Sequence, residues 1–395
     1  MKRSAWLLGA MAIAAAASPA SAQLTMQMSN GWTFSFAGNV NIFAQYQTTS
    51  ASGNTGGAPL TLVPAGKLQG FYYGTGLLPA FATFSANGKE GNTDLGVHFG
   101  FAPQVQCGGG AHDCFGAQID MRQVFLTIGG TWGTLTAGKE LGVFQRQNIL
   151  NDQTLFGVGG PVGSLIAPAI APGGTTLGRI GWGYIYPNFI AQMTYTTPGG
   201  RPGSLSIGLM DPSTFGAYGV HNTPRVEAEG SWKSGNILVF ASGTLQNSKT
   251  AASGPSTSKT AYGLAGGATW KSPTFSVHGS GYYGRGLGTT LMFTLGPTDA
   301  NGLTKSYGFY GQATFTPTNS KATFAGSYGS SYLKASTGTG KVENTLISGG
   351  VYYQATKSLK TVFEGDYAWS KLSPTVAGQN KNKSFTGAFG FMLFY

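Results

Sequence analysis

Hydrophobic and polar residues alternate at every second position over many short stretches of this chain. In the last eleven residues, bulky apolar side chains share one parity at Phe385, Phe389, Phe391 and Leu393, and the chain ends on Tyr395. A period of two is typical of a β-strand with one apolar face. A soluble protein seldom exposes such a stripe at its C-terminus, whereas a barrel in lipid needs one. From this segment alone, a strand of a soluble sandwich stays open as the alternative.

The stretch from Trp32 to Tyr46 shows the same pattern near the other end of the chain. Its apolar residues fall on even positions, at Trp32, Phe34, Phe36, Val40, Ile42 and Tyr46. The odd positions between them are largely polar, at Thr33, Ser35, Asn39, Asn41 and Gln45. One face therefore suits lipid or a subunit interface, and the other suits water.

Further alternating segments follow, separated by short turns and by longer loops rich in Gly, Ser, Thr and Pro. They include a hairpin turning at Asn87 and Gly88, and strands over 118–128 and 132–138. The pattern does not decide whether residues 179–186 form a strand or part of a loop. We count about sixteen strands, and a closed single-chain antiparallel barrel needs an even number. The sequence thus predicts an all-β, transmembrane antiparallel β-barrel in which the first and last strands pair.

Composition supports a membrane barrel. Charged residues make up 9% of the chain, against roughly 25% in a typical soluble domain, yet the mean hydropathy is only −0.02. Alternation of lipid-facing and lumen-facing residues explains both values. The net charge is +11, or +9 without Lys2 and Arg3. No basic run of five residues occurs, which argues against nucleic acid as a partner, whereas in a pore the surplus would favour anions.

The N-terminus predicts a signal peptide over residues 1–22. Lys2 and Arg3 form its basic region, 5–17 is apolar, and a small-residue cleavage site ends at Ala22 before Gln23. Residues 23–395 then form one barrel domain. No later stretch approaches 18 uncharged apolar residues, so no helical span is predicted.

The chain has two cysteines, Cys107 and Cys114. In an exported protein we expect them to form a disulfide that closes a small loop. The alternative adds His112 and Asp113 as metal ligands, but this spacing matches no zinc signature. We expect neither a metal nor a cofactor.

The segment from Arg122 to Lys139 (RQVFLTIGGTWGTLTAGK) resembles the strand pair before the constriction loop in the general diffusion porins of proteobacteria. In those proteins an Arg-Gln opens a strand that turns at Gly and returns through G-x-L-x-x-G-Arg/Lys. The Gly-Leu-Leu-Pro at 76–79, the signal peptide and the aromatic C-terminus fit as well. The resemblance implies a homotrimer of sixteen-stranded barrels in outer-membrane lipid, each with a long third loop folded into the lumen. It also implies that the outer-membrane assembly machinery reads the C-terminal strand.

The connection from Glu140 to about Gly178 fits that third loop, because a loop of nearly forty residues is uncommon unless it is functional or disordered. It also holds Arg146. The resemblance implies that Glu140 and Asp152 are loop acids that face bases on the wall across the constriction. Candidate wall bases are Arg122, Arg179 and Arg225. Two alternatives to this constriction stay open. Arg122 shares parity with apolar Val124, so its side chain would point outward. The charges of the set would otherwise be solvated loop residues without a role in the pore.

Strand periodicity places a further set of charges toward the interior, since they alternate with apolar residues. They are Arg225, Glu227, Glu229, Glu364 and Asp366. An Arg or Lys that faces lipid costs roughly 2–4 kcal/mol at the midplane, which favours the lumen. The set either tunes the selectivity of the pore or forms a structural ladder of paired charges.

The sequence thus favours an outer-membrane porin, a water-filled channel for passive diffusion of small hydrophilic solutes and ions that mildly prefers anions. A solute-specific outer-membrane channel is the alternative within transport. A barrel enzyme is more distant, because its nearest candidate pair, Asp94 and His98, lies roughly 13 Å apart on one strand face. That distance excludes a direct hydrogen bond, and no catalytic activity is predicted.

Overall fold

The computed structural model describes residues 24–51, 61–64, 66–103, 105, 119–160, 175–250, 256–376 and 379–395. The signal peptide with its cleavage site at Ala22 and Gln23, and the cysteines Cys107 and Cys114, lie outside these residues and stay predictions. Within the described ranges, no helix is both long and apolar enough to cross a membrane.

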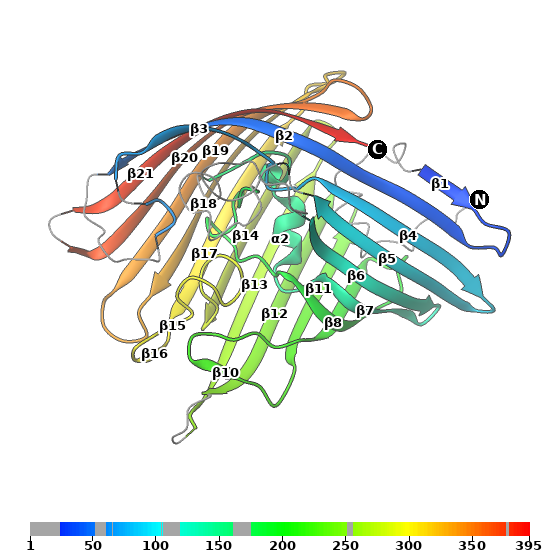
Figure 1. Cartoon of the computed structure of the whole chain (residues 1–395), viewed down its shortest axis with the longest axis horizontal. Helices are drawn as coiled ribbons and strands as arrows, with labels where there is room; N and C mark the ends of the chain where they lie inside the picture. Colours follow the sequence, from blue (N-terminus) through cyan, green and yellow to red (C-terminus); the bar gives the residue numbers. More distant parts are fainter. Residues whose placement is uncertain are drawn as a thin grey trace.

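One closed antiparallel wall accounts for nearly all of the described chain (Figure 1). Its strands are β2 (Thr33–Ala51), β3 (Gln69–Gly74), β4 (Phe81–Glu90), β5 (Thr93–Pro103), β6 (Ile119–Gly130), β7 (Gly133–Leu141), β8 (Phe189–Thr196), β9 (Gly203–Met210), β11 (Arg225–Ser234), β12 (Ile237–Thr250), β13 (Ser258–Lys271), β14 (Phe275–Arg285), β17 (Lys305–Phe315), β18 (Ala322–Lys334), β19 (Lys341–Gln354), β20 (Leu359–Val376) and β21 (Gln379–Phe394). Strands β3 and β4 pair with the two halves of β2 and form one interrupted strand. The barrel therefore has 16 strands, as predicted.

The remaining elements are short. They are β1 (Leu24–Gln27), β10 (Tyr218–Val220), β15 (Thr298–Asp299), β16 (Gly302–Leu303), the helix α2 (Arg146–Asn151) and the 3₁₀ turn η1 (Gln153–Phe156). Figure 1 shows α2 inside the ring of strands.

The first and last strands close the barrel, as the alternation predicts. β2 pairs with β21 from Asn39 opposite Phe394 to Ala51 opposite Asn382. At the chain end, the Gly38 N–H donates to Tyr395 O (2.9 Å) and the Tyr395 N–H donates to Gly38 O (3.0 Å). The apolar parity of both strands is exposed, at Val40, Ile42, Tyr46, Phe385, Phe389, Phe391 and Leu393. The polar residues Asn39, Asn41 and Gln45 of β2 are buried on the inner face.

The turn predicted at Asn87 and Gly88 is displaced by four residues, to Gly91 and Asn92. Asn87 pairs with Gly96 on one side and Thr33 on the other, and the chain turns after Glu90 instead. Gly91 there has φ 58°, a left-handed conformation that suits glycine in a tight turn. Gly88 serves the packing of Trp32, because a Cβ at this position would lie 2.6 Å from the indole ring.

The third long connection runs between β7 and β8 and is longer than predicted at its C-terminal end. It begins after Leu141, and β8 starts only at Phe189. The segment 179–186 belongs to this loop, with local hydrogen bonds such as Trp182 N–H to Arg179 O (2.9 Å). Gly178, Gly181 and Gly183 have φ of 54°, 84° and 144°, which breaks strand geometry.

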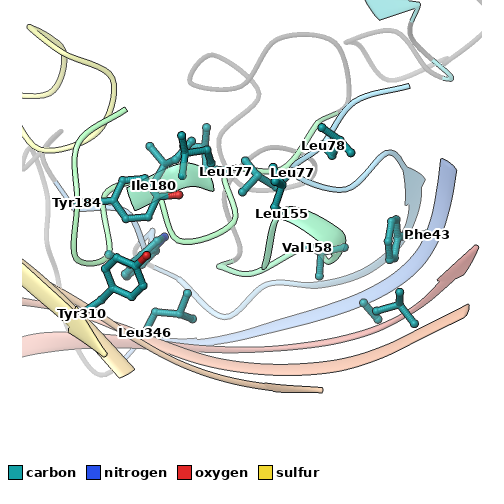
Figure 2. Close-up of a cluster of buried hydrophobic side chains, with 14 of the residues drawn as sticks. Phe43, Leu77, Leu78, Leu155, Val158, Leu177, Ile180, Tyr184, Tyr310 and Leu346 are labelled. Carbon is teal, nitrogen blue, oxygen red and sulfur yellow. The ribbon is translucent and has the colours of Figure 1, made fainter. Parts of the chain in front are cut away.

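The third loop folds into the lumen on an apolar core. Figure 2 shows side chains of the loop, among them Leu155, Val158, Leu177 and Ile180, beside inward side chains of the wall. The buried wall residues of this cluster are Phe43, Leu141, Tyr310, Leu346, Tyr352, Val362, Ala368, Ala388, Met392 and Phe394. The loop therefore packs on inward apolar side chains of β2 and β19–β21 that lie among buried polar residues such as Asn41 and Glu364.

A second connection, between β14 and β17, also enters the lumen. Tyr186 of the third loop donates from its N–H to Thr290 O (2.8 Å) and accepts from the Met292 N–H (3.1 Å). A second apolar cluster forms around this contact, from Phe144, Ile185, Phe215, Ala261, Ala265, Tyr282, Leu287, Met292 and Phe293. Two loops together narrow the interior of the barrel.

Candidate functional site: the lumen around the third loop

Glu227 on β11 fixes the beginning of the third loop. Its Oε2 accepts hydrogen bonds from the N–H groups of Val143 (2.8 Å) and Phe144 (3.0 Å). Its Oε1 lies 3.0 Å from the Nε of Arg225, and both side chains are fully buried. Because successive inward positions on a strand are two residues apart, Arg225 and Glu227 share the inner face of β11. Arg225 neutralises the carboxylate that holds the loop backbone.

The next inward position of β11, Glu229, holds the helix α2. Its Oε1 accepts from Arg146 Nη2 (2.7 Å) and from Gln147 Nε2 (3.1 Å). Burial alone would lower the pKa of Arg146, but the charge of Glu229 and its hydrogen bond outweigh burial and raise that pKa above its ordinary value. Arg146 is therefore a fixed cation of the loop.

Glu364 on β20 holds the far side of the loop. Its Oε1 accepts from the N–H groups of Val158 (2.7 Å) and Gly159 (2.6 Å), and its Oε2 accepts from the Tyr352 hydroxyl (2.5 Å). Asp366 is buried two residues further along the same inner face. Glu227, Glu229 and Glu364 thus hold the loop from the wall.

Substitution of Gly157 by Ala tests how tightly the loop fits against Glu364. A Cβ at Gly157 would lie 1.8 Å from Glu364 Oε2, so the carboxylate or the loop must move. We expect Gly157→Ala to lower the free energy of unfolding by about 1–3 kcal/mol, as overpacking does. Urea titration of the protein folded in lipid vesicles measures this change. Gly230→Ala on β11, where a Cβ would meet nothing within 4 Å, is the matched control; equal effects of the two variants would contradict the prediction.

Asp152 and Arg179 organise the interior of the third loop. Asp152 Oδ1 accepts from the N–H of Thr154 (2.9 Å) at the start of η1, and its Oδ2 accepts from the Tyr184 hydroxyl (2.7 Å). Burial raises the pKa of Asp152, although Arg179 and the hydrogen bonds from Tyr184 and Thr154 oppose this shift. Arg179 donates to Leu346 O (3.1 Å) and is fully buried.

Two predicted assignments of charge to loop or wall are wrong. Arg179, a candidate wall base, lies in the returning part of the loop, because Gly178 and Gly181 prevent a strand there. Glu140, a candidate loop acid, lies on β7. It pairs there with Ile190 of β8, and the strand pairing continues to Leu141. The Glu140 carboxylate accepts from Gln123 Nε2 (2.9 and 3.2 Å) and stays on the wall.

A β-bulge decides the direction of Arg122. Gln123 pairs with Gly100 and Met121 pairs with Phe101, so Arg122 is an extra residue in β6. Bulges re-aim side chains at one point of a strand. The outward direction that parity with Val124 suggested is therefore wrong: Met121 and Val124 are exposed on the outer face, whereas Arg122 lines the lumen. Its Nε donates to Asp120 Oδ2 (2.7 Å).

A cavity of about 440 Å³ lies between this part of the wall and the two inward loops. Of the predicted pore residues, Arg122 alone lines it within the described part of the chain. Its other polar lining includes Asp120 and Gln123, and its apolar lining includes Leu77, Leu78, Leu155, Leu177, Ile180 and Leu291. These other lining residues were not predicted from the sequence. One signal for them was present, because the adjacent Leu77 and Leu78 before Pro79 break the alternation of apolar and polar residues between β3 and β4.

The residues considered for catalysis or metal binding are engaged elsewhere. Asp94 forms an ion pair with Lys89 (3.3 Å), and His98 Nδ1 lies 2.7 Å from Ser85 Oγ. Over the ranges that the structure describes, no three His, Cys, Asp or Glu side chains group as metal ligands.

Comparison with known proteins gives one family and one fold. Residues 9–375 match the family model described as Gram-negative porin. A search of curated proteins found no significant match to this sequence.

Similar solved structures are outer-membrane proteins. They include the outer membrane channel DcaP of Acinetobacter baumannii (14% identity, TM-score 0.66, 92% of this chain and 99% of that chain). They also include OmpF of Salmonella typhi in complex with daunomycin (13%, 0.55, 93% and 100%) and OmpT of Vibrio cholerae in its trimer form (13%, 0.54, 92% and 100%). At these identities the likeness shows the fold.

Proposed function

Because this chain belongs to the Gram-negative porin family, we propose that it lets small hydrophilic solutes and ions cross the outer membrane by passive diffusion, with a preference for anions. The protein is an integral β-barrel of the outer membrane and a channel, and the porin family and fold are those of non-enzymatic channels. A wall of 16 strands is wide enough to leave an aqueous interior around inserted loops.

The proposed preference for anions rests on the charges that line the cavity. Of the other inward acids, Glu140, Asp152, Glu227, Glu229 and Glu364 accept hydrogen bonds from the protein, and Asp366 is buried in the wall. At the cavity, Arg122 binds Asp120 through its Nε (2.7 Å) and keeps its terminal nitrogens for a solute, in a chain whose net charge is +11. A solute that passes this surface meets a net positive field.

The assembly that we propose is a homotrimer in outer-membrane lipid. The exposed apolar parity of the strands supports contact with lipid and with neighbouring subunits, and a structurally similar protein, OmpT of Vibrio cholerae, has a trimer form. We further propose that the outer-membrane assembly machinery recognises β21 and its terminal Tyr395.

Recordings in planar bilayers test the channel and its ion preference. In a salt gradient, we expect a reversal potential that favours anions, and we expect Arg122→Ala to lower the anion-to-cation permeability ratio about threefold. A unit charge at a few ångströms in a water-like dielectric is worth about 1 kcal/mol or less, which sets this magnitude. Arg201→Ala removes the same charge from an exposed turn and should leave the ratio unchanged. Absence of conductance contradicts the channel, and cation preference contradicts the selectivity.

A further inference from the structure

The cavity beside Arg122 has two chemically different faces. We infer that it binds amphipathic carboxylates, meaning solutes with a short apolar body and one anionic group, and that this class is favoured among the solutes of the pore. The inference rests on the proposed channel function and adds a substrate class to it.

The anionic group is recognised at the bulge of β6. Arg122 uses its Nε for Asp120 (2.7 Å), and among the described residues neither of its terminal nitrogens has a partner. These nitrogens present the fork that binds a carboxylate through two parallel hydrogen bonds. Lys139 pairs with the outward Val124, so its ammonium lies on the outer face of the wall, where it donates to Met121 O (2.7 Å). Arg122 is therefore the base that faces the solute.

The apolar body is recognised by aliphatic side chains from three segments. Leu77 and Leu78 come from the interruption between β3 and β4, Leu155 and Leu177 come from the third loop, and Leu291 comes from the connection between β14 and β17. A fully hydrophilic solute gains nothing from such a surface, whereas a short alkyl or aryl group loses contact with water on it.

Hydrogen bonds fix this apolar surface in place. The Leu77 N–H donates to Gly157 O (2.9 Å), which joins the interrupted strand to the third loop. Asn41 Nδ2 donates to Leu78 O (3.0 Å), and the Gly76 N–H donates to Asn41 Oδ1 (3.0 Å). The site is therefore built before a solute arrives. Its volume of about 440 Å³ exceeds what an inorganic ion needs and falls within the usual range for small-ligand pockets.

The experiment uses the full-length protein in planar bilayers that carry a chloride current. Three probes separate the two halves of the ligand: hexanoate has body and charge, acetate has the charge, and hexanamide has the body. We expect hexanoate to interrupt the current at a concentration at least tenfold lower than acetate or hexanamide. Arg122→Ala should abolish this advantage, Leu177→Ala should reduce it, and Arg201→Ala should preserve it.

The outcomes distinguish the site from the channel. A normal chloride current with equal block by the three probes overturns the carboxylate site and leaves the proposed channel intact, whereas the absence of chloride current overturns the channel itself. Block by hexanoate that survives Arg122→Ala also overturns the site. If a variant does not insert into the bilayer, the comparison of the three probes on the unmodified protein decides.

Discussion

Replacement of Glu227 by Ala is expected to destabilise the barrel by about 3–5 kcal/mol, because it leaves a buried cation without its partner. Arg225 is fully buried and forms its ion pair with Glu227 at 3.0 Å. The same substitution removes the acceptor for the N–H groups of Val143 and Phe144, so the third loop loses its first attachment. We therefore expect a larger and noisier single-channel conductance together with a lower urea midpoint in lipid vesicles.

Two further variants separate the charge from the attachment. The double variant Arg225→Leu/Glu227→Leu removes both buried charges and should recover much of the stability, since apolar replacement of a buried pair is often neutral. It should not restore the quiet conductance, because the N–H groups of Val143 and Phe144 still lack an acceptor. Glu90→Ala removes an exposed acid at a turn and should change neither quantity. If Glu227→Ala matches Glu90→Ala in both measurements, the anchoring role is wrong.

Deletion of residues 391–395 is expected to prevent formation of the barrel altogether. These residues supply the pairing of β21 with β2 from Ile42 to Asn39 and its pairing with the first residues of β20. They also supply Met392 and Phe394 to the core under the third loop. The truncated chain should show neither a heat-modifiable band after refolding in detergent nor protein in the outer-membrane fraction of cells.

Shorter deletions test closure against recognition by the assembly machinery. Removal of Tyr395 alone should allow refolding in detergent and should reduce the amount in the outer membrane, if the machinery reads the terminal aromatic residue. Removal of β1 is the control in detergent, because its four residues are exposed and pair with the first residues of β2, from Thr33 to Phe36. Normal insertion of the chain that lacks residues 391–395 would overturn the prediction.

The alternation of apolar and polar residues predicted most of the wall, because a strand in lipid needs one apolar face over its whole length. It failed where one residue changes the geometry without changing the pattern. The bulge at Arg122 adds a single residue to β6, and nothing in the residue types marks it. The glycines at 178, 181 and 183 act through positive φ, but 64 glycines in the chain make any three of them uninformative.

The roles of the inward charges also depended on contacts distant in sequence. Periodicity places Glu227, Glu229 and Glu364 on the inner face, yet their partners belong to a loop that is about 80 to 200 residues away in the chain. The predicted alternatives, selectivity or a ladder of paired charges, both omitted the function that the structure shows for these acids, which is attachment of the loop. Arg122 is the predicted base that reaches the cavity.

The attachment of the third loop has a consequence for the design of new pores. Glu227 and Glu364 bind the loop through backbone N–H groups, which every residue except proline carries. The side chains that project from the loop into the cavity are not used in these bonds. The chemistry of the passage and the attachment of the loop are therefore separable at lining residues outside the apolar core, such as Thr175. Leu155 and Leu177 belong to that core and have to stay apolar, and Gly157 and the two wall carboxylates are kept.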